Sequence, residues 1–432
     1  EMCIRDRMKI SQAHIEQLRN LLARPAQRFV IVSHTNPDGD AVGSSLAWAE
    51  ILRGMGYAVT CIVPNKYPYF LDWMEGIDEI VIFKTDTEGR AVRAIEEADA
   101  IFCLDFNAVP RLEILSETIQ ANTTARRVLI DHHLSPDGHF DLSFSYPDSS
   151  STCFLVYSII EALFGTDAIT RQMAEALYVG IMTDTGNFAY SFLTPELFRA
   201  VAVLVEKGIS IPDIHNSVYN AYTEGRARLF GYAINRKMEI IQDGTVAYMS
   251  LLESEMRRFQ FQQGDSEGFV NYALTIKKMK MSAMFLAHRK FIRVSLRSRG
   301  DVDVNLFARK YFNGGGHKNA AGGKSFVSME ETIAHYIRSV KEFAEEGHLG
   351  WCHGRLPPQG LHHGGPDAEL HPDRRTAVHL AAGRQQARRR AGEPLPGPAL
   401  QPARQPPGAH RRGAHAARCR KAHPRRLPPH GV

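Results

Sequence analysis

The sequence predicts an α/β protein in which a parallel sheet with helical crossovers is linked to a smaller α+β domain. Short apolar runs alternate with helix-like segments through residues 8–190, a pattern typical of parallel strands joined by helices. Beyond residue 225, strand-like runs follow one another more closely, and a helical pattern ends the series. We therefore expect a first domain at 8–190, a helical connector at 191–225, a second domain at 226–346 and a tail at 347–432.

The first domain contains five short apolar runs that we interpret as strands. They lie at residues 29–32, 58–63, 79–83, 100–104 and 128–130. A turn containing Asn36, Pro37 and Asp38 separates the first run from a helical pattern at 41–53. Further helices are expected at 152–164, 171–182 and 195–207.

The second domain begins after a connection at about 212–225. A helix or strand is expected at 229–241, since the pattern does not distinguish the two. Strands at 245–252, 281–288 and 291–297, a helix at 304–312, a glycine-rich loop and a last helix at 330–345 complete it.

Composition excludes several classes of protein. The chain has 432 residues and is 44% hydrophobic, enough for two or three cores. It has no apolar run near the roughly 18 residues that span a bilayer, so we expect no membrane partner. A signal-peptide pattern is absent, and the six cysteines form no CxxC pair. These features favour a reduced, cytoplasmic protein.

The two ends differ from the body. The tail at 347–432 carries 14 Arg and 1 Lys against 4 acidic residues, whereas residues 1–346 carry 37 basic and 43 acidic residues. It also holds 13 of the 22 prolines. Such a segment cannot form a core. It could be a basic arm, a solvated linker or GC-rich DNA translated out of frame, and we favour the last. Residues 1–7 precede Met8, the expected start.

Acidic and histidine residues recur where the predicted elements of the first domain end. The four groups are His34, Asp38 and Asp40; Asp105; Asp131, His132 and His133; and Asp184. Each alone could be a turn residue or a helix cap. Parallel strands, however, present their carboxyl ends at one edge of a sheet, where ligands bind, so the first three groups should converge.

Converging carboxylates repel one another unless a cation neutralises them, so a metal site is the economical interpretation. Imidazole and carboxylate ligands without thiolates suit Mn²⁺, and Mg²⁺ or Co²⁺ would also fit. Two imidazoles and four carboxylates are more ligands than one ion with open positions needs. Two ions about 3.5–4 Å apart would use them and would neutralise charge on a reacting phosphoryl group. The chemistry indicated is phosphoester hydrolysis.

A glycine-rich segment in the second domain is the other distinctive feature. Gly314, Gly315 and Gly316 precede His317, with Lys318 beside it. Consecutive glycines let backbone N–H groups approach an anion. Arg297 and Ser298 lie upstream at the end of a strand, and an arginine there could grip a phosphate. A flexible loop with solvated side chains is the alternative interpretation.

Together these motifs resemble the DHH phosphoesterase superfamily, and most closely its bacterial bifunctional oligoribonucleases, the nanoRNases. The resemblance covers residues 8–346 and rests on five ordered motifs. They are His34-x-x-x-Asp38-x-Asp40, Asp105, Asp131-His132-His133, Asp184 and Gly314-Gly315-Gly316-His317. It implies a catalytic DHH domain followed by a substrate-binding DHHA1 domain.

The resemblance also implies a role for each residue. His34 and Asp38 would bind one Mn²⁺ and Asp40 and His132 the other, with Asp105 and Asp184 bridging. His133 would contact the scissile phosphate, and Asp131 would orient a histidine. Arg297, Ser298 and the segment Gly314, Gly315, Gly316 and His317 would hold the far end of a short nucleotide. The implied substrates are short oligoribonucleotides and 3′-phosphoadenosine 5′-phosphate, and a homodimer is plausible.

Other functions are compatible with parts of the pattern. A manganese pyrophosphatase shares the metal motifs but lacks the glycine-rich loop, and a RecJ-like exonuclease should be longer. A phosphodiesterase for linear or cyclic dinucleotides stays open. A non-catalytic RNA-binding module belongs to a different class, and a pure binder needs no six-group metal site.

Overall fold

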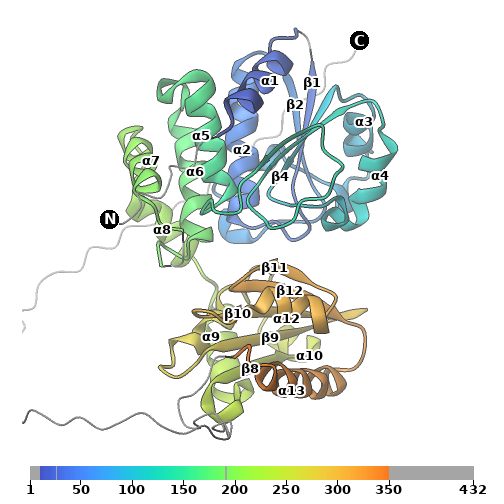
Figure 1. Ribbon diagram of the computed structural model, residues 1–432, viewed down its shortest axis with the longest axis vertical. Coiled ribbons are helices and arrows are strands. Elements are labelled where there is room, and N and C mark those ends of the chain that lie inside the picture. The colour runs from blue at the N-terminus through green and yellow to red at the C-terminus, as the bar shows by residue number, and fades with distance from the viewer. Residues whose placement is uncertain (1–9, 26, 190–191, 350–432) are drawn as a thin grey trace, which may run out of the picture. The chain divides into compact units, whose positions relative to one another are not determined.

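The computed structural model describes residues 10–25, 27–189 and 192–349 (Figure 1). The interpretations of residues 1–7 as foreign and of Met8 as the start lie outside the described residues. So does the tail from residue 350 onward, and its out-of-frame origin stays a prediction.

A six-stranded parallel sheet forms the first part of the chain (Figure 1). Its strands are β1 (Arg28–Val32), β2 (Ala58–Val63), β3 (Val81–Ile82), β4 (Ala100–Leu104), β5 (Arg126–Asp131) and β6 (Leu142–Ser145). Their order is β3-β2-β1-β4-β5-β6, and every neighbouring pair is parallel. The connections therefore run in opposite directions on either side of the β1–β4 pair, which makes that pair the topological switch point.

Helices cover both faces of this sheet, so its strands are apolar on both sides. Phe29 and Ile31 belong to one core cluster, and Val30 and Val32 belong to another. The first cluster includes α1 (Gln12–Leu22), α2 (Gly39–Gly54), α5 (Thr152–Phe164) and α6 (Arg171–Asp184). The second includes α3 (Arg90–Glu96), the 3₁₀ segment η4 (Val109–Leu115) and α4 (Ser116–Ala121). Then follow α7 (Pro195–Glu206) and α8 (Ile211–Tyr219).

A second six-stranded sheet has the order β11-β12-β10-β9-β8-β7. The strands are β7 (Glu239–Ile241), β8 (Val246–Leu251), β9 (Met281–His288), β10 (Phe291–Ser298), β11 (Gly315–His317) and β12 (Ala320–Ser325). Only β8 and β9 are parallel. On one face α12 (Val304–Tyr311) and α13 (Met329–Glu345) pack against the sheet. The other face carries α9 (Glu224–Tyr232), α10 (Glu253–Arg258) and α11 (Phe269–Tyr272).

The predicted fold class is confirmed, and several elements match to the residue. The strand at 58–63, the strand at 100–104 and the helix at 152–164 are observed as β2, β4 and α5. The expected strand at 79–83 is wrong in extent, because β3 has only two residues and lies between 3₁₀ turns. The short edge strand β6 was not predicted, and its four residues give a weak alternating pattern.

The glycine-rich segment is a strand and a hairpin rather than the expected loop. Gly315–His317 forms β11, which pairs antiparallel with β12 across Lys318 and Asn319. A Cβ on Gly314 would lie 1.9 Å from the Gly322 carbonyl oxygen, so glycine is required there for close strand packing. The connection expected near 212–225 contains α8 and the start of α9.

Among the described residues, no helix is long and apolar enough to cross a bilayer. The domain boundaries expected at 8–190, 191–225 and 226–346 stay predictions. Limited proteolysis followed by mass spectrometry would test them, since cleavage should concentrate in the connector.

Candidate metal centre

The acidic and histidine residues of the first sheet gather at its switch point. The loop after β1 supplies His34 and Asp38, and the first turn of α2 supplies Asp40. Asp105 follows β4, and His132 follows β5. Because β1, β4 and β5 are adjacent and parallel, their carboxyl ends bring these side chains to one edge. Asp184 reaches the same place from the last residue of α6.

Helix termini hold the two carboxylates of the first loop. Asp38 is the N-cap of α2, where one of its oxygens accepts hydrogen bonds from the backbone N–H groups of Asp40 (3.0 Å) and Ala41 (3.1 Å). Asp40 accepts from the backbone N–H groups of Thr152 (2.7 Å) and Cys153 (2.8 Å) at the start of α5. Both carboxylates are therefore oriented before any ligand arrives.

Asp105 occupies the centre of the group, and its two oxygens face different histidines. Its Oδ2 lies 3.4 Å from Nε2 of His34, and its Oδ1 lies 3.6 Å from Nε2 of His132. The Thr152 hydroxyl donates to Oδ1 at 3.0 Å. Asp105 has a left-handed backbone conformation with φ 64°, an uncommon conformation for an aspartate that here directs its side chain inward. The geometry suits a carboxylate that bridges two cations.

Backbone carbonyls determine which nitrogen of each histidine is available. Nδ1 of His34 lies 2.9 Å from the Thr35 carbonyl oxygen, and Nδ1 of His132 lies 3.2 Å from that of Ser149. Because a carbonyl only accepts, each Nδ1 carries a proton, which leaves each Nε2 as the ring nitrogen able to bind a cation. The Nε2 of His132 faces Asp184 Oδ2 at 3.3 Å and Asp40 Oδ2 at 3.7 Å. A cation between these atoms would be held by the imidazole and by both carboxylates.

Burial makes this concentration of negative charge costly. Burial and the neighbouring charge of Asp184 raise the pKa of Asp40 to about 7. Burial raises the pKa of Asp105 and of Asp184 well above the usual range, with the surrounding aspartates adding to both shifts. Burial also lowers the pKa of His34, which keeps that imidazole neutral. A cation bound among these carboxylates would neutralise their charge and offset this cost.

The described residues contain four overlapping groups of potential ligand atoms; Asp131, His133 and His317 enter only two of them, and the remaining two consist of residues expected as metal ligands. His34, Asp38 and Asp105 form one, and Asp40, His132 and Asp184 form the other, with the ligand atoms in each group within 4.8 Å of one another. All six residues expected as metal ligands are therefore brought together. The donor set of imidazole nitrogens and carboxylate oxygens fits divalent cations such as Mn²⁺.

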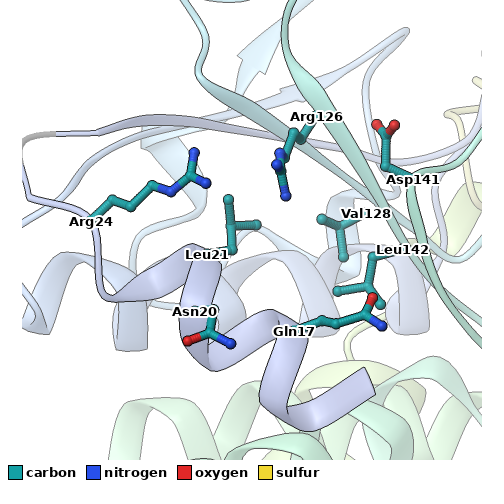
Figure 2. Close-up of a pocket in the computed structure, with 8 residues that line it drawn as sticks. All are labelled: Gln17, Asn20, Leu21, Arg24, Arg126, Val128, Asp141 and Leu142. Carbon is teal, nitrogen blue, oxygen red and sulfur yellow. The ribbon is translucent and has the colours of Figure 1, made fainter. Parts of the chain in front are cut away.

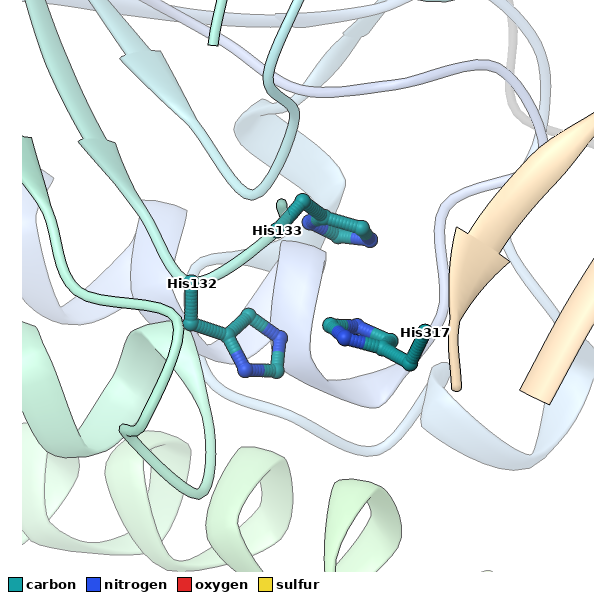
Figure 3. Close-up of side chains that lie close together, drawn as sticks. All are labelled: His132, His133 and His317. Carbon is teal, nitrogen blue, oxygen red and sulfur yellow. The ribbon is translucent and has the colours of Figure 1, made fainter. Parts of the chain in front are cut away.

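The ring of His133 lies beside those of His132 and His317 (Figure 3), and its Nδ1 is 3.8 Å from Asp105 Oδ1. Asp131 holds it through both oxygens, which accept from the His133 ring Nδ1 (2.7 Å) and backbone N–H (3.0 Å). The ring of His317 stacks on that of His133 with centroids 4.5 Å apart, and lies 4.7 Å from that of His132. Burial, followed by the charges of His133 and His132, lowers the pKa of His317 to about 2. Burial also lowers the pKa of His133, so the stacked rings of His133 and His317 are both held neutral.

The remaining residues expected to bind substrate differ in whether their polar groups are still available. Arg297 lies close enough to the candidate metal ligands for its charge to lower the pKa of Asp184. Ser298 is buried, and its hydroxyl donates to the Val302 carbonyl oxygen at 2.6 Å. The N–H groups of Gly314 and Gly316 donate to the Ala308 carbonyl oxygen and to Asn305 Oδ1. Those two N–H groups are therefore already used within the fold, because the segment packs against α12.

Several supporting residues were not anticipated. Thr152 contacts both Asp40 and Asp105, and the run Ser149-Ser150-Ser151-Thr152 before α5 is a helix-start signal that could have indicated it. Gly180 lets α6 pack closely against α2 and α5, since a Cβ there would lie 2.1 Å from Cys153 Sγ and 2.8 Å from Asp40 Oδ1. Arg111 lowers the pKa of both His34 and His133 by its charge. No local signal distinguished Gly180 or Arg111.

A separate cavity of about 250 Å³ lies where β5 and β6 begin (Figure 2). His132 follows the opposite end of β5. The lining residues of the cavity are Gln17, Asn20, Leu21, Arg24, Arg126, Val128, Asp141 and Leu142. With one carboxylate and no imidazole, this cavity lacks a comparable set of metal ligands.

Comparison with known proteins identifies the family. Residues 28–181 match the DHH family, N-terminal domain, and residues 243–346 match the DHHA1 domain. A solved structure of an exopolyphosphatase-related protein from Bacteroides fragilis is 39% identical, with a TM-score of 0.73. The alignment covers 79% of this chain and 99% of that one. The chain belongs to the DHH family.

Curated relatives of this DHH-family chain carry a functional name. The bifunctional oligoribonuclease and PAP phosphatase NrnA of Thermus thermophilus is 26% identical over 317 residues, covering 72% of this chain and 89% of the relative. The Bacillus subtilis protein of the same name is 26% identical over 304 residues, covering 70% and 90%. Family membership and these names support a hydrolase.

Proposed function

We propose that this protein hydrolyses short oligoribonucleotides to mononucleotides and removes the 3′-phosphate from 3′-phosphoadenosine 5′-phosphate, using Mn²⁺. The observation that carries the proposal is the pair of imidazole Nε2 atoms, on His34 and His132, that face the two oxygens of the buried Asp105 carboxylate. That arrangement suits a two-cation phosphoesterase. The names of the relatives supply the substrate class.

The six grouped residues would hold the two cations. We assign His34 and Asp38 to one ion, Asp40 and His132 to the other, and Asp105 and Asp184 to positions between them. The distances from Asp105 to both histidines support its bridging role. The bound cations would supply a nucleophilic water at neutral pH and would neutralise charge on the phosphoryl group.

The residues beside the cations would position the substrate. Asp131 fixes the ring of His133 through a 2.7 Å contact, and we assign His133 to the scissile phosphate. His317 stacks on His133 and therefore lies where the same phosphate group would arrive. Arg297 supplies a positive charge near Asp184 and would hold a more distant phosphate. Ser298, Gly314, Gly315 and Gly316 would act mainly by shaping the strands that present Arg297 and His317.

A substrate panel tests the proposal. The purified full-length chain is incubated with Mn²⁺, Mg²⁺ or Co²⁺ and with a pentaribonucleotide, a 24-mer RNA, 3′-phosphoadenosine 5′-phosphate or pyrophosphate. We expect turnover of the pentaribonucleotide and the bisphosphate, fastest with Mn²⁺. Preference for pyrophosphate, or no turnover of any substrate, would contradict the proposal.

Two alternatives are outcomes of the same panel. A linear or cyclic dinucleotide added to it would reveal a dinucleotide phosphodiesterase if it were the preferred substrate. A non-catalytic RNA-binding module would bind the pentaribonucleotide without turnover. The gathered set of imidazole and carboxylate ligands favours catalysis, because RNA binding alone requires no such set.

We also propose a cytoplasmic location and a homodimer. Within the described part of the chain, Cys61, Cys103 and Cys153 are free and buried, as suits a reducing compartment. Cell fractionation would test the location, and sedimentation equilibrium would test the dimer.

A further inference from the structure

The second sheet exposes basic side chains on one face beside the proposed site. In β10, Ile292, Val294 and Leu296 belong to the core beneath α12 and α13. Residues alternate across a strand, so Arg293, Ser295 and Arg297 share the opposite face. Arg293 is exposed there, and Ser295 and Arg297 are half-buried. Two arginines therefore lie four residues apart on the same side of one strand.

The neighbouring strand gives this face a floor of small residues. Residues directly paired in antiparallel strands share a face. Ala320 pairs with Arg297, and Gly322 pairs with Ser295. On the next strand His317 pairs with Ala320, which places it in the same row as Arg297. A polymer lying across Gly322 and Ser295 would meet little side-chain bulk between the two arginines.

The positive charges on this face are incompletely neutralised. Lys324 pairs with Arg293 across the strands, but its ammonium already contacts Glu113 at 2.6 Å. No carboxylate lies within 4.0 Å of the Arg293 or Arg297 guanidinium among the described residues. Glu267 is the acidic group whose charge acts most strongly on Arg293. Burial, followed by the charge of Asp38, raises the pKa of Glu267 to about 7.

The guanidinium of Arg293 is crowded yet accessible. Burial among protein atoms lowers the pKa of Arg293. The negative charge of Glu267 partly offsets this effect, and the positive charge of Arg297 lowers the pKa further. The side chain nevertheless exposes surface to solvent, and this accessible surface decides whether an anion can reach it. An arginine with no close carboxylate, beside a second arginine, favours phosphate as a ligand.

We propose that Arg293 binds a second backbone phosphate of an oligonucleotide, two or more nucleotides beyond the phosphate held at Arg297. This inference rests on the proposed function and extends it to substrate length. Four residues of strand separate the two arginines by about 13 Å. Consecutive phosphates in a strand, like the two phosphates on a single ribose, are joined by six covalent bonds of about 1.5 Å. The distance between their phosphorus atoms is therefore at most about 9 Å. Arg293 therefore contributes to oligonucleotides and not to 3′-phosphoadenosine 5′-phosphate.

The test compares Arg293→Gln with Arg338→Gln, which removes the same charge from an exposed position on α13, against the opposite face of the sheet. For Arg293→Gln we expect KM for a pentaribonucleotide to rise about tenfold, the loss of one charge-assisted contact. The slope of log KM against log salt should fall by about 0.7, as for one phosphate contact on a single strand. For Arg293→Gln, KM for the bisphosphate should stay within about twofold of the wild-type value. Arg338→Gln should leave KM unchanged for both substrates.

Other results would overturn the inference. Equal increases in KM for both substrates would mean that the two arginines grip one phosphate, and no increase would make Arg293 an ordinary surface residue. Fluorescence anisotropy of a labelled pentaribonucleotide in EDTA measures the same contact without turnover, and unchanged affinity there would also refute it. A wild-type chain that turns over neither substrate would instead refute the proposed function, so the two failures are distinguishable. Unchanged melting temperatures confirm that the variants fold.

Discussion

Removal of metal should destabilise the protein, and the loss should grow with pH. Asp40 has a folded pKa raised from 3.8 to about 7, so the folded state binds more protons than the unfolded state between those values. In metal-free protein, stability should therefore fall as pH rises through that window, and the full penalty should be present above pH 7. Bound cations would remove the penalty by neutralising the carboxylates.

The size of this effect follows from the shift. A rise of about 3 pKa units corresponds to about 4 kcal/mol for Asp40. A change of that size moves the melting temperature of a domain of this length by about 10 °C. Because Asp40 interacts with Asp184 and His132, the measured value belongs to the group as a whole.

Thermal unfolding between pH 5 and 8, with EDTA or with saturating Mn²⁺, measures the effect. The stabilisation by Mn²⁺ should increase steadily over this range. Asp40→Asn should reduce the pH dependence while Asp105 and Asp184 retain the rest, whereas Asp167→Asn, at an exposed position in a 3₁₀ turn, should leave it unchanged. An equal stabilisation by Mn²⁺ at pH 5 and pH 8 would refute the electrostatic reasoning.

Three substitutions probe the centre further. Asp105→Ala should abolish turnover and leave the fold nearly intact, so near-wild-type activity in the phosphate-release assay would refute the bridging role. Thr152→Val removes the 3.0 Å hydrogen bond to Asp105 and should lower kcat about tenfold, while Thr170→Val, at the start of α6, should cost some stability but leave kcat and metal affinity unchanged. Gly180→Ala would place a methyl group against Asp40 and Cys153, so metal affinity by calorimetry should fall at least tenfold; unchanged affinity would mean that α6 shifts without moving Asp40.

Local pattern was sufficient for the strands and helices that dominate the fold. The apolar runs at 58–63 and 100–104 are β2 and β4, because strands covered on both faces are apolar throughout and bounded by polar turns. The two-residue β3 and the four-residue β6 were misjudged or missed, since edge strands that short carry little periodicity. The glycine-rich segment was interpreted as a loop, because strand pairing of Gly315–His317 depends on β12 rather than on local preference.

The chain alone determined which residues could form the metal centre. Asp105 and His132 directly follow neighbouring parallel strands, so residue type and position predicted that they meet the residues after β1 at one edge of the sheet. Asp184 ends α6, and only the packing of that helix brings it to the same edge. What only the tertiary structure decided is how those groups are held. The proton on each histidine depends on the carbonyls of Thr35 and Ser149, and the direction of Asp40 depends on the start of α5, 112 residues away. Hydrogen bonds between distant segments leave no periodic trace in sequence, so these contacts became visible only once the helices had packed.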